Sequence, residues 1–200
     1  MCFFSQVSRS AVELSHRFNA NFNDAARFTP GVFNAFTFPL TPIITHRSPH
    51  EIELAQWGLI PQWSKDTSIQ AGTLNARIET LSEKPSFKHV IHNRCLILAD
   101  GFFEWQWLDD KGRSKQKYLI SLPDQAIYAY AGLYSDWQNP VTHQIIRTYT
   151  IMTAEANAMM GQIHNSKKRM PIVVANEFEW LNNCPLHMAN DLLMPLKVSS

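Results

Sequence analysis

Apolar residues along the chain gather in short stretches bounded by Gly, Pro, Asn or Asp, and most stretches are rich in β-branched and aromatic side chains. This pattern is typical of β-strands rather than of long helices. Strands are predicted at residues 52–60, 95–99, 117–122, 126–134, 145–153 and 171–174. Short turns such as Leu122-Pro123-Asp124-Gln125 join several of them, which favours an antiparallel or mixed sheet over alternating βαβ units.

Helical spacing is confined to three short segments. The apolar residues from Val7 to Phe18 recur at intervals of three or four, so an amphipathic helix is predicted over residues 6–18. Residues 154–160 and 177–181 also predict short helices, and a loop rich in Asn, Phe and Pro is predicted from 19 to 42. The fold class predicted from these elements is α+β.

Size and charge narrow the function classes. The chain has 200 residues, 45% of them apolar, which fits one globular domain, predicted over residues 2–196. Lys and Arg total 18 against 17 acidic residues, so net charge does not indicate a polyanion-binding protein and any nucleic-acid site must be local. No apolar run approaches the ~20 residues that span a bilayer, and no leader segment is recognised. A cytoplasmic protein without membrane contact is expected.

The cysteines predict neither a disulfide framework nor a zinc site. Cys2, Cys95 and Cys184 are odd in number and form no CxxC pair, which fits a reducing compartment. The histidines show no metal-ligand spacing, so neither a metal nor another cofactor is expected. Cys95 lies in a predicted strand and is expected in the core, whereas Cys184 is expected to have no role.

Cys2 stands directly behind Met1, and this position offers unusual chemistry. Removal of one methionine would place a thiol and a free α-amine on the same residue. Such a 1,2-aminothiol can condense with an aldehyde to a Schiff base, and the sulfur can then close a five-membered thiazolidine ring. A free thiol titrates near pKa ~8.5 and an α-amine near ~7.7–8.0, so a modest fraction of each is nucleophilic at neutral pH. Taken alone, a cysteine at position 2 is usually an accident of sequence.

Three further segments set polar residues among apolar or aromatic neighbours, where sites are expected. Asn75-Ala76-Arg77-Ile78-Glu79-Thr80 offers an amide, a guanidinium and a carboxylate, although a surface turn would also explain it. Glu104 lies between aromatic residues, where burial would raise its pKa and suit it to proton transfer; an ion-paired edge residue is the alternative. His164 precedes the cluster Lys167-Lys168-Arg169, which could hold a phosphate, although most lone histidines have structural roles.

The tryptophans admit two interpretations. Trp57, Trp63, Trp105 and Trp107 could stack with unpaired bases, or at least half of them could pack in the core. Trp137 and Trp180 are predicted to be core residues.

In their order along the chain, these segments resemble one family. The order is Met1-Cys2, Trp57-Gly58-Leu59-Ile60-Pro61-x-Trp63, Asn75-Ala76-Arg77-x-Glu79-Thr80, Ala99-Asp100-Gly101-Phe102-Phe103-Glu104-Trp105, and His164 followed by Arg169-Met170-Pro171. This arrangement is similar to the SRAP (SOS response-associated peptidase) family of abasic-site processing proteins. Each motif is weakly specific, but the five in this order are strongly so. The resemblance implies a barrel-like sheet core with short flanking helices.

The resemblance also implies a covalent response to DNA damage. Family members lose Met1, bind single-stranded DNA with an abasic site, and link the cysteine to the ring-opened aldehyde as a stable thiazolidine. Cys2 would then be the nucleophile, through amine and thiol, and Asn75 would position the N-terminus. Glu104 would transfer protons during Schiff-base formation. His164 would assist opening of the sugar ring and, in reverse, release of the crosslink, a lyase-type activity.

The DNA contacts follow from the same resemblance. Arg77 and Arg169 would hold phosphates beside the lesion, and Trp63 would stack next to the abasic gap. Lys167 and Lys168 could substitute as phosphate contacts, because the loop before Arg169 is longer than the usual His-x-Arg-Met-Pro. Specificity would lie in the aldehyde reaction, while the backbone and stacking supply binding. A monomer that binds single-stranded DNA is expected.

Position 4 departs from the family. Many members follow the cysteine with Gly-Arg, whereas Phe3-Phe4 follows here, so a phosphate contact by that arginine is absent or supplied elsewhere.

Two other functions remain open at this point. A thiol peptidase or N-terminal-nucleophile hydrolase could use Cys2, Glu104 and His164 to cleave peptide bonds, and autoproteolytic removal of Met1 would use the same residues. A non-covalent reader of modified DNA bases could use the aromatic residues as its pocket. DNA binding that survives Cys2→Ala and leaves no species stable to a denaturing gel would favour the reader.

Overall fold

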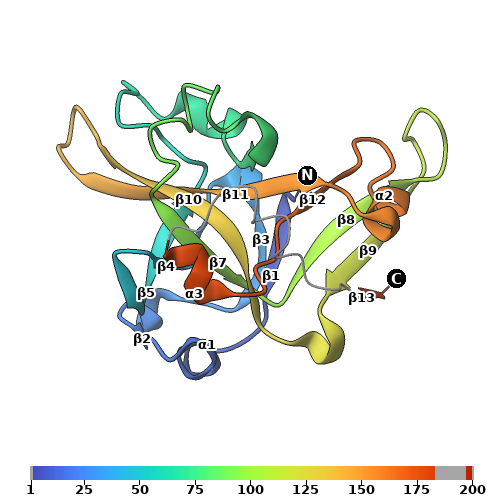
Figure 1. Ribbon diagram of the computed structural model, residues 1–200, viewed down its shortest axis with the longest axis horizontal. Helices are drawn as coiled ribbons and strands as arrows, with labels where there is room; N and C mark the ends of the chain where they lie inside the picture. Colours follow the sequence, from blue (N-terminus) through green and yellow to red (C-terminus); the bar gives the residue numbers. More distant parts are fainter. Residues whose placement is uncertain (1, 183–196, 200) are drawn as a thin grey trace.

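The computed structural model describes residues 2–182 and 197–199, and its core is a closed barrel of five strands (Figure 1). The strands are β4 (Leu40–Thr45), β5 (Ser48–Trp57), β7 (Arg94–Ala99), β10 (Tyr128–Gln138) and β11 (Ile145–Glu155). They pair in the order β11-β10-β7-β4-β5, and β5 returns to pair with β11. Closure leaves these strands without a long unpaired edge.

One pairing makes the barrel mixed. β5 and β11 run parallel where Gln56 faces Thr148 and Trp57 faces Tyr149, whereas the other four pairings are antiparallel. Trp57 and Tyr149 are both buried and stack with ring centroids 6.1 Å apart, so large aromatic rings fill the closing seam. The predicted α+β class, with a mixed, barrel-like sheet core, is confirmed.

A second sheet extends from the barrel. It contains β13 (Lys197–Ser199), β9 (Lys115–Ser121), β8 (Gly101–Trp107), β1 (Phe4–Val7) and β3 (Gly31–Asn34), in that order. Asp100 separates β7 from β8, and its buried carboxylate accepts hydrogen bonds from the Ser8 N–H at 2.7 Å and the Gln6 side chain at 3.1 Å. The N-terminal strand is therefore fixed where the chain passes from one sheet to the other.

Short elements complete the fold. β2 (Asn21–Phe22) pairs with β5, and both β6 (Asn75–Arg77) and β12 (Arg169–Pro171) pair with β11. The helices are α1 (Ala11–Phe18), α2 (Ala158–Ile163) and α3 (Glu177–Leu181), with 3-10 turns η1 (Ala25–Arg27), η2 (Ala35–Thr37), η3 (Ser68–Gly72), η4 (Ile78–Thr80) and η5 (Pro123–Gln125). No helix among residues 2–182 and 197–199 is long and apolar enough to cross a membrane.

The predicted strands are confirmed in place, with shifted ends. Five of the six overlap β5, β7, β9, β10 and β11 over most of their length. The sixth, predicted at 171–174, differs because β12 ends at Pro171 and Val173 makes only a single bridge to Tyr130. Cys95, Trp137 and Trp180 are buried, as predicted. Cys184 and the predicted domain end at residue 196 lie outside the described residues.

The helix and loop predictions need correction near the N-terminus and after β11. Residues 6 and 7 belong to β1, and α1 begins only at Ala11, behind Ser10, which forms a capping box with Glu13. The predicted loop 19–42 contains β2, η1, β3, η2 and the start of β4. The predicted helix 154–160 is wrong in its first half, because β11 runs to Glu155 and α2 starts behind the Asn157 cap.

Candidate active site

Cys2 lies two residues before the start of β1 and is completely buried. Its Sγ is 4.0 Å from the Phe4 carbonyl oxygen. Burial raises the pKa of the thiol far above its usual range, and the negative charge of Glu104 raises it further. The thiol is therefore protonated at neutral pH, so in this structure the sulfur is not a ready thiolate.

Asn75 ties the barrel to Cys2. It lies in β6, which pairs with β11 so that Asn75 faces Ile151. Its Nδ2 donates a hydrogen bond of 2.9 Å to the Cys2 carbonyl oxygen. Its Oδ1 is buried and has no hydrogen-bond partner among the described residues. A buried acceptor without a partner is costly, and this one marks a place where a donor group could bind.

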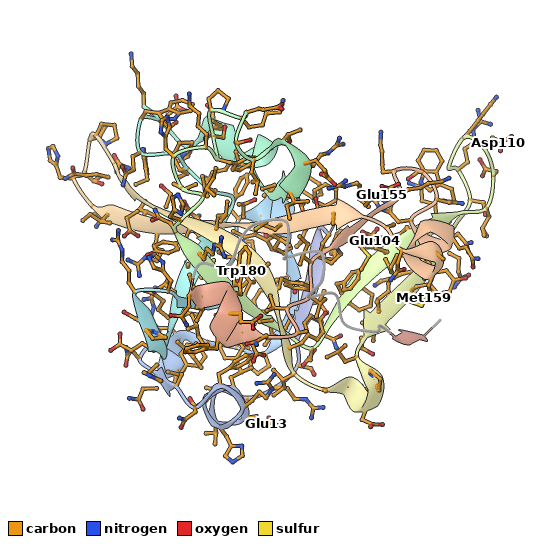
Figure 2. The ribbon with its side chains drawn as sticks, viewed as in Figure 1. Glu13, Glu104, Asp110, Glu155, Met159 and Trp180 are labelled. Carbon is orange, nitrogen blue, oxygen red and sulfur yellow. The ribbon has the colours of Figure 1, made fainter. Side chains whose placement is uncertain are left out.

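Glu104 reaches the same region from β8. It is 4% exposed, and burial raises the pKa of its carboxyl group. A cleft of about 210 Å³ is lined by Phe3, Phe4, Glu104, Trp105 and Lys115. Figure 2 shows Glu104 in the part of the molecule where β8 passes the end of β11. A carboxyl group with a raised pKa can both give and accept a proton near neutrality.

His164 caps the C-terminal end of α2, whose Met160 and Ile163 belong to the same apolar cluster as Cys2. Its Nδ1 lies 2.8 Å from the Arg169 carbonyl oxygen. The tautomer that donates this hydrogen bond leaves Nε2 as an acceptor. Burial lowers the pKa of His164 to about 4, so the imidazole is neutral at physiological pH and can take up a proton.

Arg169 is held by the protein itself. Its guanidinium donates to both carboxylate oxygens of Glu79, at 2.7 and 2.9 Å, and to the Thr153 carbonyl oxygen at 2.8 Å. The arginine is buried whereas Glu79 is half exposed. The guanidinium is therefore already occupied, unlike that of an arginine that is open to a phosphate. These contacts also fix the backbone of Arg169, whose carbonyl oxygen lies beside His164.

The other predicted DNA contacts are exposed. Arg77 follows Asn75 by two residues in β6 and faces Thr153 of β11, so it lies on the same strand as the Cys2 anchor. Lys167 and Lys168 are both exposed. Lys167 lines a hollow that it shares with Asp109 and Asp110, whose acidity works against an anion there.

Trp57 and Trp63 differ in their exposure to solvent. Trp57 is a core residue whose Nε1 donates to the Leu74 carbonyl oxygen at 2.9 Å. Trp63 is 56% exposed and lines a hollow of about 220 Å³ together with Pro85 and His89. Trp63 therefore has the exposure that stacking requires, and Trp57 does not.

Asn165 was not recognised from the sequence. Its Oδ1 accepts from the Trp107 N–H at 3.0 Å, and its Nδ2 donates to the Trp107 carbonyl oxygen at 2.8 Å. One side chain thus pairs with β8 as a neighbouring strand would, and holds the loop after His164 against the strand of Glu104. The sequence offered only an asparagine next to the histidine as a signal.

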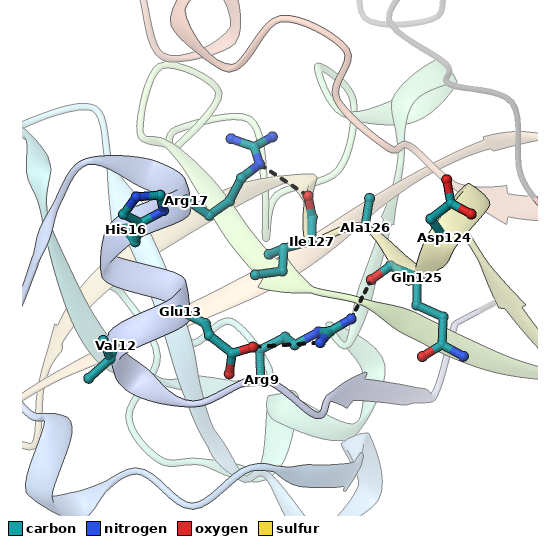
Figure 3. Close-up of a pocket in the computed structure, with 9 residues that line it drawn as sticks. All are labelled: Arg9, Val12, Glu13, His16, Arg17, Asp124, Gln125, Ala126 and Ile127. Atoms are coloured by element: carbon teal, nitrogen blue, oxygen red, sulfur yellow. Dashed lines mark hydrogen bonds and ion pairs between the residues drawn. The ribbon is translucent and has the colours of Figure 1, made fainter.

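Another hollow, of about 510 Å³, lies between α1 and η5 (Figure 3). None of the predicted site residues lines it. Its arginines are held by the protein: Arg9 donates to the Gln125 carbonyl oxygen and Arg17 pairs with Glu177 at 2.6 Å. Within the part of the chain that the structure describes, no group of three or more His, Cys, Asp or Glu residues could hold a metal. The expectation of no metal stays a prediction.

Solved structures share the fold. A protein from Bacteroides thetaiotaomicron matches with a TM-score of 0.88 and 33% identity, covering 98% of this chain and 90% of the other. A protein from Bordetella bronchiseptica matches with a TM-score of 0.81 over 99% of this chain and 98% of the other, and at 22% identity the likeness concerns the fold alone. The chain therefore shares the fold of the mixed barrel with a second sheet with these solved proteins.

The sequence model of one family, described as SOS response associated peptidase (SRAP), matches residues 1–199, and the chain belongs to this family. Abasic site processing protein YoqW of Bacillus subtilis is 44% identical over 143 residues, which cover 70% of this chain and 61% of YoqW. Abasic site processing protein HMCES of Gallus gallus is 30% identical over 168 residues, covering 70% of this chain and 48% of HMCES. The matched part is thus less than two thirds of each relative.

Proposed function

We propose that this protein processes abasic sites in single-stranded DNA by forming a covalent crosslink through Cys2, once Met1 has been removed. The observation that carries the proposal is the burial of Cys2 against Asn75, at a cleft lined by Glu104. The names of the relatives, which are abasic site processing proteins, support the substrate. An abasic nucleotide offers an aldehyde and no base, so chemistry rather than base readout would give specificity.

The first step forms a Schiff base. The Cys2 amine attacks the aldehyde carbon of the ring-opened deoxyribose, and the carbinolamine loses its hydroxyl group as water to give the imine. Glu104, whose carboxyl pKa is raised by burial, supplies a proton to the departing hydroxyl group. Asn75 holds the Cys2 carbonyl oxygen by a hydrogen bond, which restricts rotation of the residue that carries the amine.

The second step closes the thiazolidine ring. The Cys2 sulfur adds to the imine carbon, a C–S bond forms, and the thiol proton ends on the nitrogen. This sequence suits a thiol with a raised pKa, because the sulfur carries its proton until the imine is present. Protein and DNA are joined with the loss of one water.

His164 assists opening of the sugar ring. The neutral imidazole can take the proton of the anomeric hydroxyl group at Nε2 while the ring oxygen gains a proton from solvent. Release of the crosslink would reverse the two steps above: the C–S bond breaks as the nitrogen proton returns to sulfur, and a water molecule, giving a proton to His164, then adds to the imine carbon and hydrolyses the imine. Arg169, held by Glu79, positions this histidine through its backbone, whose carbonyl oxygen and N–H nitrogen lie 2.8 and 3.2 Å from the His164 Nδ1.

Binding of the strand is proposed for the exposed residues among the predicted DNA contacts. Arg77, Lys167 and Lys168 would contact phosphates, and Trp63 would stack on a neighbouring base. Arg169 is retained as a phosphate contact only if DNA displaces Glu79 from it.

Intact-mass spectrometry tests the proposal. The protein is incubated with a single-stranded oligonucleotide carrying one abasic site, and separately with one carrying a tetrahydrofuran analogue that has no aldehyde. We expect loss of Met1, then an adduct equal to the oligonucleotide mass less one water, only with the aldehyde. Cys2→Ala should abolish it, and Cys95→Ala, the control at another buried cysteine, should not.

Other results would point elsewhere. A protein without Met1 that forms no adduct contradicts the proposal. Turnover of added peptides that is lost in Cys2→Ala would favour a peptidase. A stable adduct of the same mass in Cys2→Ala would show that the thiol is not needed, because the amine of residue 2 alone can form an imine of that mass.

A further inference from the structure

One face of the β8–β9 hairpin carries partly exposed aromatic rings next to lysines. Trp105 faces Lys117 across the two strands, and Trp107 faces Lys115. Residues directly opposite in an antiparallel pair point to the same side, and so do alternate residues in one strand. Phe103, Trp105, Trp107, Lys115 and Lys117 therefore share one side of the sheet, and we call these five residues the hairpin face.

The lysines of the hairpin face lie over its rings and stay accessible. The Lys117 Nζ is 4.0 Å from the Phe103 ring centroid and 5.7 Å from that of Trp105, and the Lys115 Nζ is 5.5 Å from that of Trp107. Both lysines are exposed. Cation–π contacts hold the ammonium groups close to the rings without removing them from solvent, so each remains available to an anion.

The hairpin face is continuous with the cleft that Glu104 lines. Phe4 of β1 pairs with Phe103, and its ring meets that of Trp105 edge-on with centroids 5.0 Å apart. The cleft is lined by Trp105 and by Lys115, its one cationic lining residue. β1 itself, from Phe4 to Val7, brings no positive charge. The cationic side chain that lines the cleft thus comes from β9.

The positive charge of the hairpin comes from β9, because the two acids and two cations of residues 108–114 balance. Residues 108–117 contain four cations and two acids. One acid, Asp109, is used within the turn, because its carboxylate accepts from the N–H groups of Lys111 at 2.8 Å and Ser114 at 2.6 Å. Figure 2 places the other acid, Asp110, at the far tip of the hairpin. The base of the hairpin, beside the cleft, is therefore positive.

We propose that the hairpin face binds the single-stranded DNA that flanks the lesion on one side, with phosphates at Lys115 and Lys117 and bases against Trp105 and Trp107. Aromatic rings alternating with cations are what a nucleic-acid strand without fixed sequence requires. Duplex DNA would not fit, because its bases are not available for stacking. This inference rests on the proposed function only for the identity of the reacting nucleotide; binding of the strand is separable from it.

The test measures affinity for an intact single strand, without a lesion, by fluorescence anisotropy between 50 and 200 mM salt. Each phosphate contact on a single strand contributes a slope of about −0.7 in log affinity against log salt. Loss of two contacts in Lys115→Gln/Lys117→Gln should therefore make the salt-induced fall in affinity about sevenfold smaller than in the wild type. Lys115→Arg/Lys117→Arg keeps both charges and should keep the wild-type slope.

A matched control removes two exposed cations elsewhere. Arg27, which ends η1, and Arg47, which lies between β4 and β5, are exposed and belong to neither hairpin strand, so Arg27→Gln/Arg47→Gln should leave the slope unchanged.

The outcomes separate this inference from the proposed function. A wild-type slope in Lys115→Gln/Lys117→Gln, or no binding of single strands by the wild type, overturns the hairpin face as a DNA contact. A slope that falls as expected in a protein that forms no crosslink supports the hairpin face and rejects the crosslinking proposal.

Discussion

Acidification should destabilise this protein through His164. The imidazole is 7% exposed, and burial lowers its pKa from the ordinary 6.5 to about 4. In the unfolded chain the same group titrates near ~6.5. Between these two values the unfolded state binds a proton that the folded state rejects, so the stabilising contribution is complete above pH ~6.5 and is lost as pH falls towards ~4.

The magnitude follows from the shift. One pKa unit corresponds to ~1.4 kcal/mol, so the full contribution is about 3 kcal/mol, and roughly 2 kcal/mol of it is lost between pH 7 and pH 5. Glu104 acts in the opposite direction, because its raised pKa lets the folded state bind a proton earlier than the unfolded state does. The His164 contribution must therefore be isolated by substitution.

Urea unfolding of the wild type and of His164→Gln at pH 7 and pH 5 isolates it. The fall in unfolding free energy over this range should be about 2 kcal/mol smaller in His164→Gln than in the wild type. His16→Gln, at an exposed histidine of α1, should behave as the wild type. If His164→Gln and the wild type lose equal stability, the imidazole is not held neutral by burial and its role as a proton acceptor fails with it.

Three substitutions test the parts around the histidine. Glu79→Gln should lower the free energy of unfolding by about 1–2 kcal/mol, less than for a fully buried pair because Glu79 is half exposed; unchanged urea midpoints would show that the pair with Arg169 is screened. Asn165→Ala removes both bonds to Trp107, so it should cost about 1–2 kcal/mol in the same assay and slow crosslinking at pH 7; an unaltered rate would mean that the loop is positioned by other contacts. Glu104→Gln should slow crosslinking about 100-fold, as expected for loss of a proton-transfer group, and leave affinity for lesion-free single strands intact; a parallel loss of both would assign Glu104 to binding.

Burial patterns explain which strands the sequence could predict. The barrel strands are apolar and β-branched, and β7 is buried at all six positions, so it reads as a strand from composition alone. β8 was not predicted because it carries aromatic residues on both faces of the sheet, Phe102 on the buried face and Phe103 and Trp105 on the other. Apolar and polar residues therefore do not alternate along this strand as they do in a strand with one polar face. Val7 fits helical spacing by coincidence, although Ser10 and Glu13 signal the true start of α1.

Some features of the candidate site could also be predicted from the sequence, and others could not. Burial of Glu104 followed from its aromatic neighbours, because that environment is local in sequence. The pairing of Arg169 with Glu79 joins residues 90 positions apart, and only the paths of β6 and β12 along β11 bring them together. Nothing in a single sequence distinguishes an arginine free for phosphate from one held by a distant carboxylate.

The complete burial of Cys2 has a consequence for redox chemistry. Peroxides and disulfides react with exposed thiolates, and a buried thiol with a raised pKa is a poor target for both. While the fold is intact, the sulfur is therefore expected to react only with a compound that has first bonded to the adjacent amine. The oxidation rate of Cys2 in dilute peroxide would then report how often the N-terminal segment opens, rather than how reactive the cysteine is.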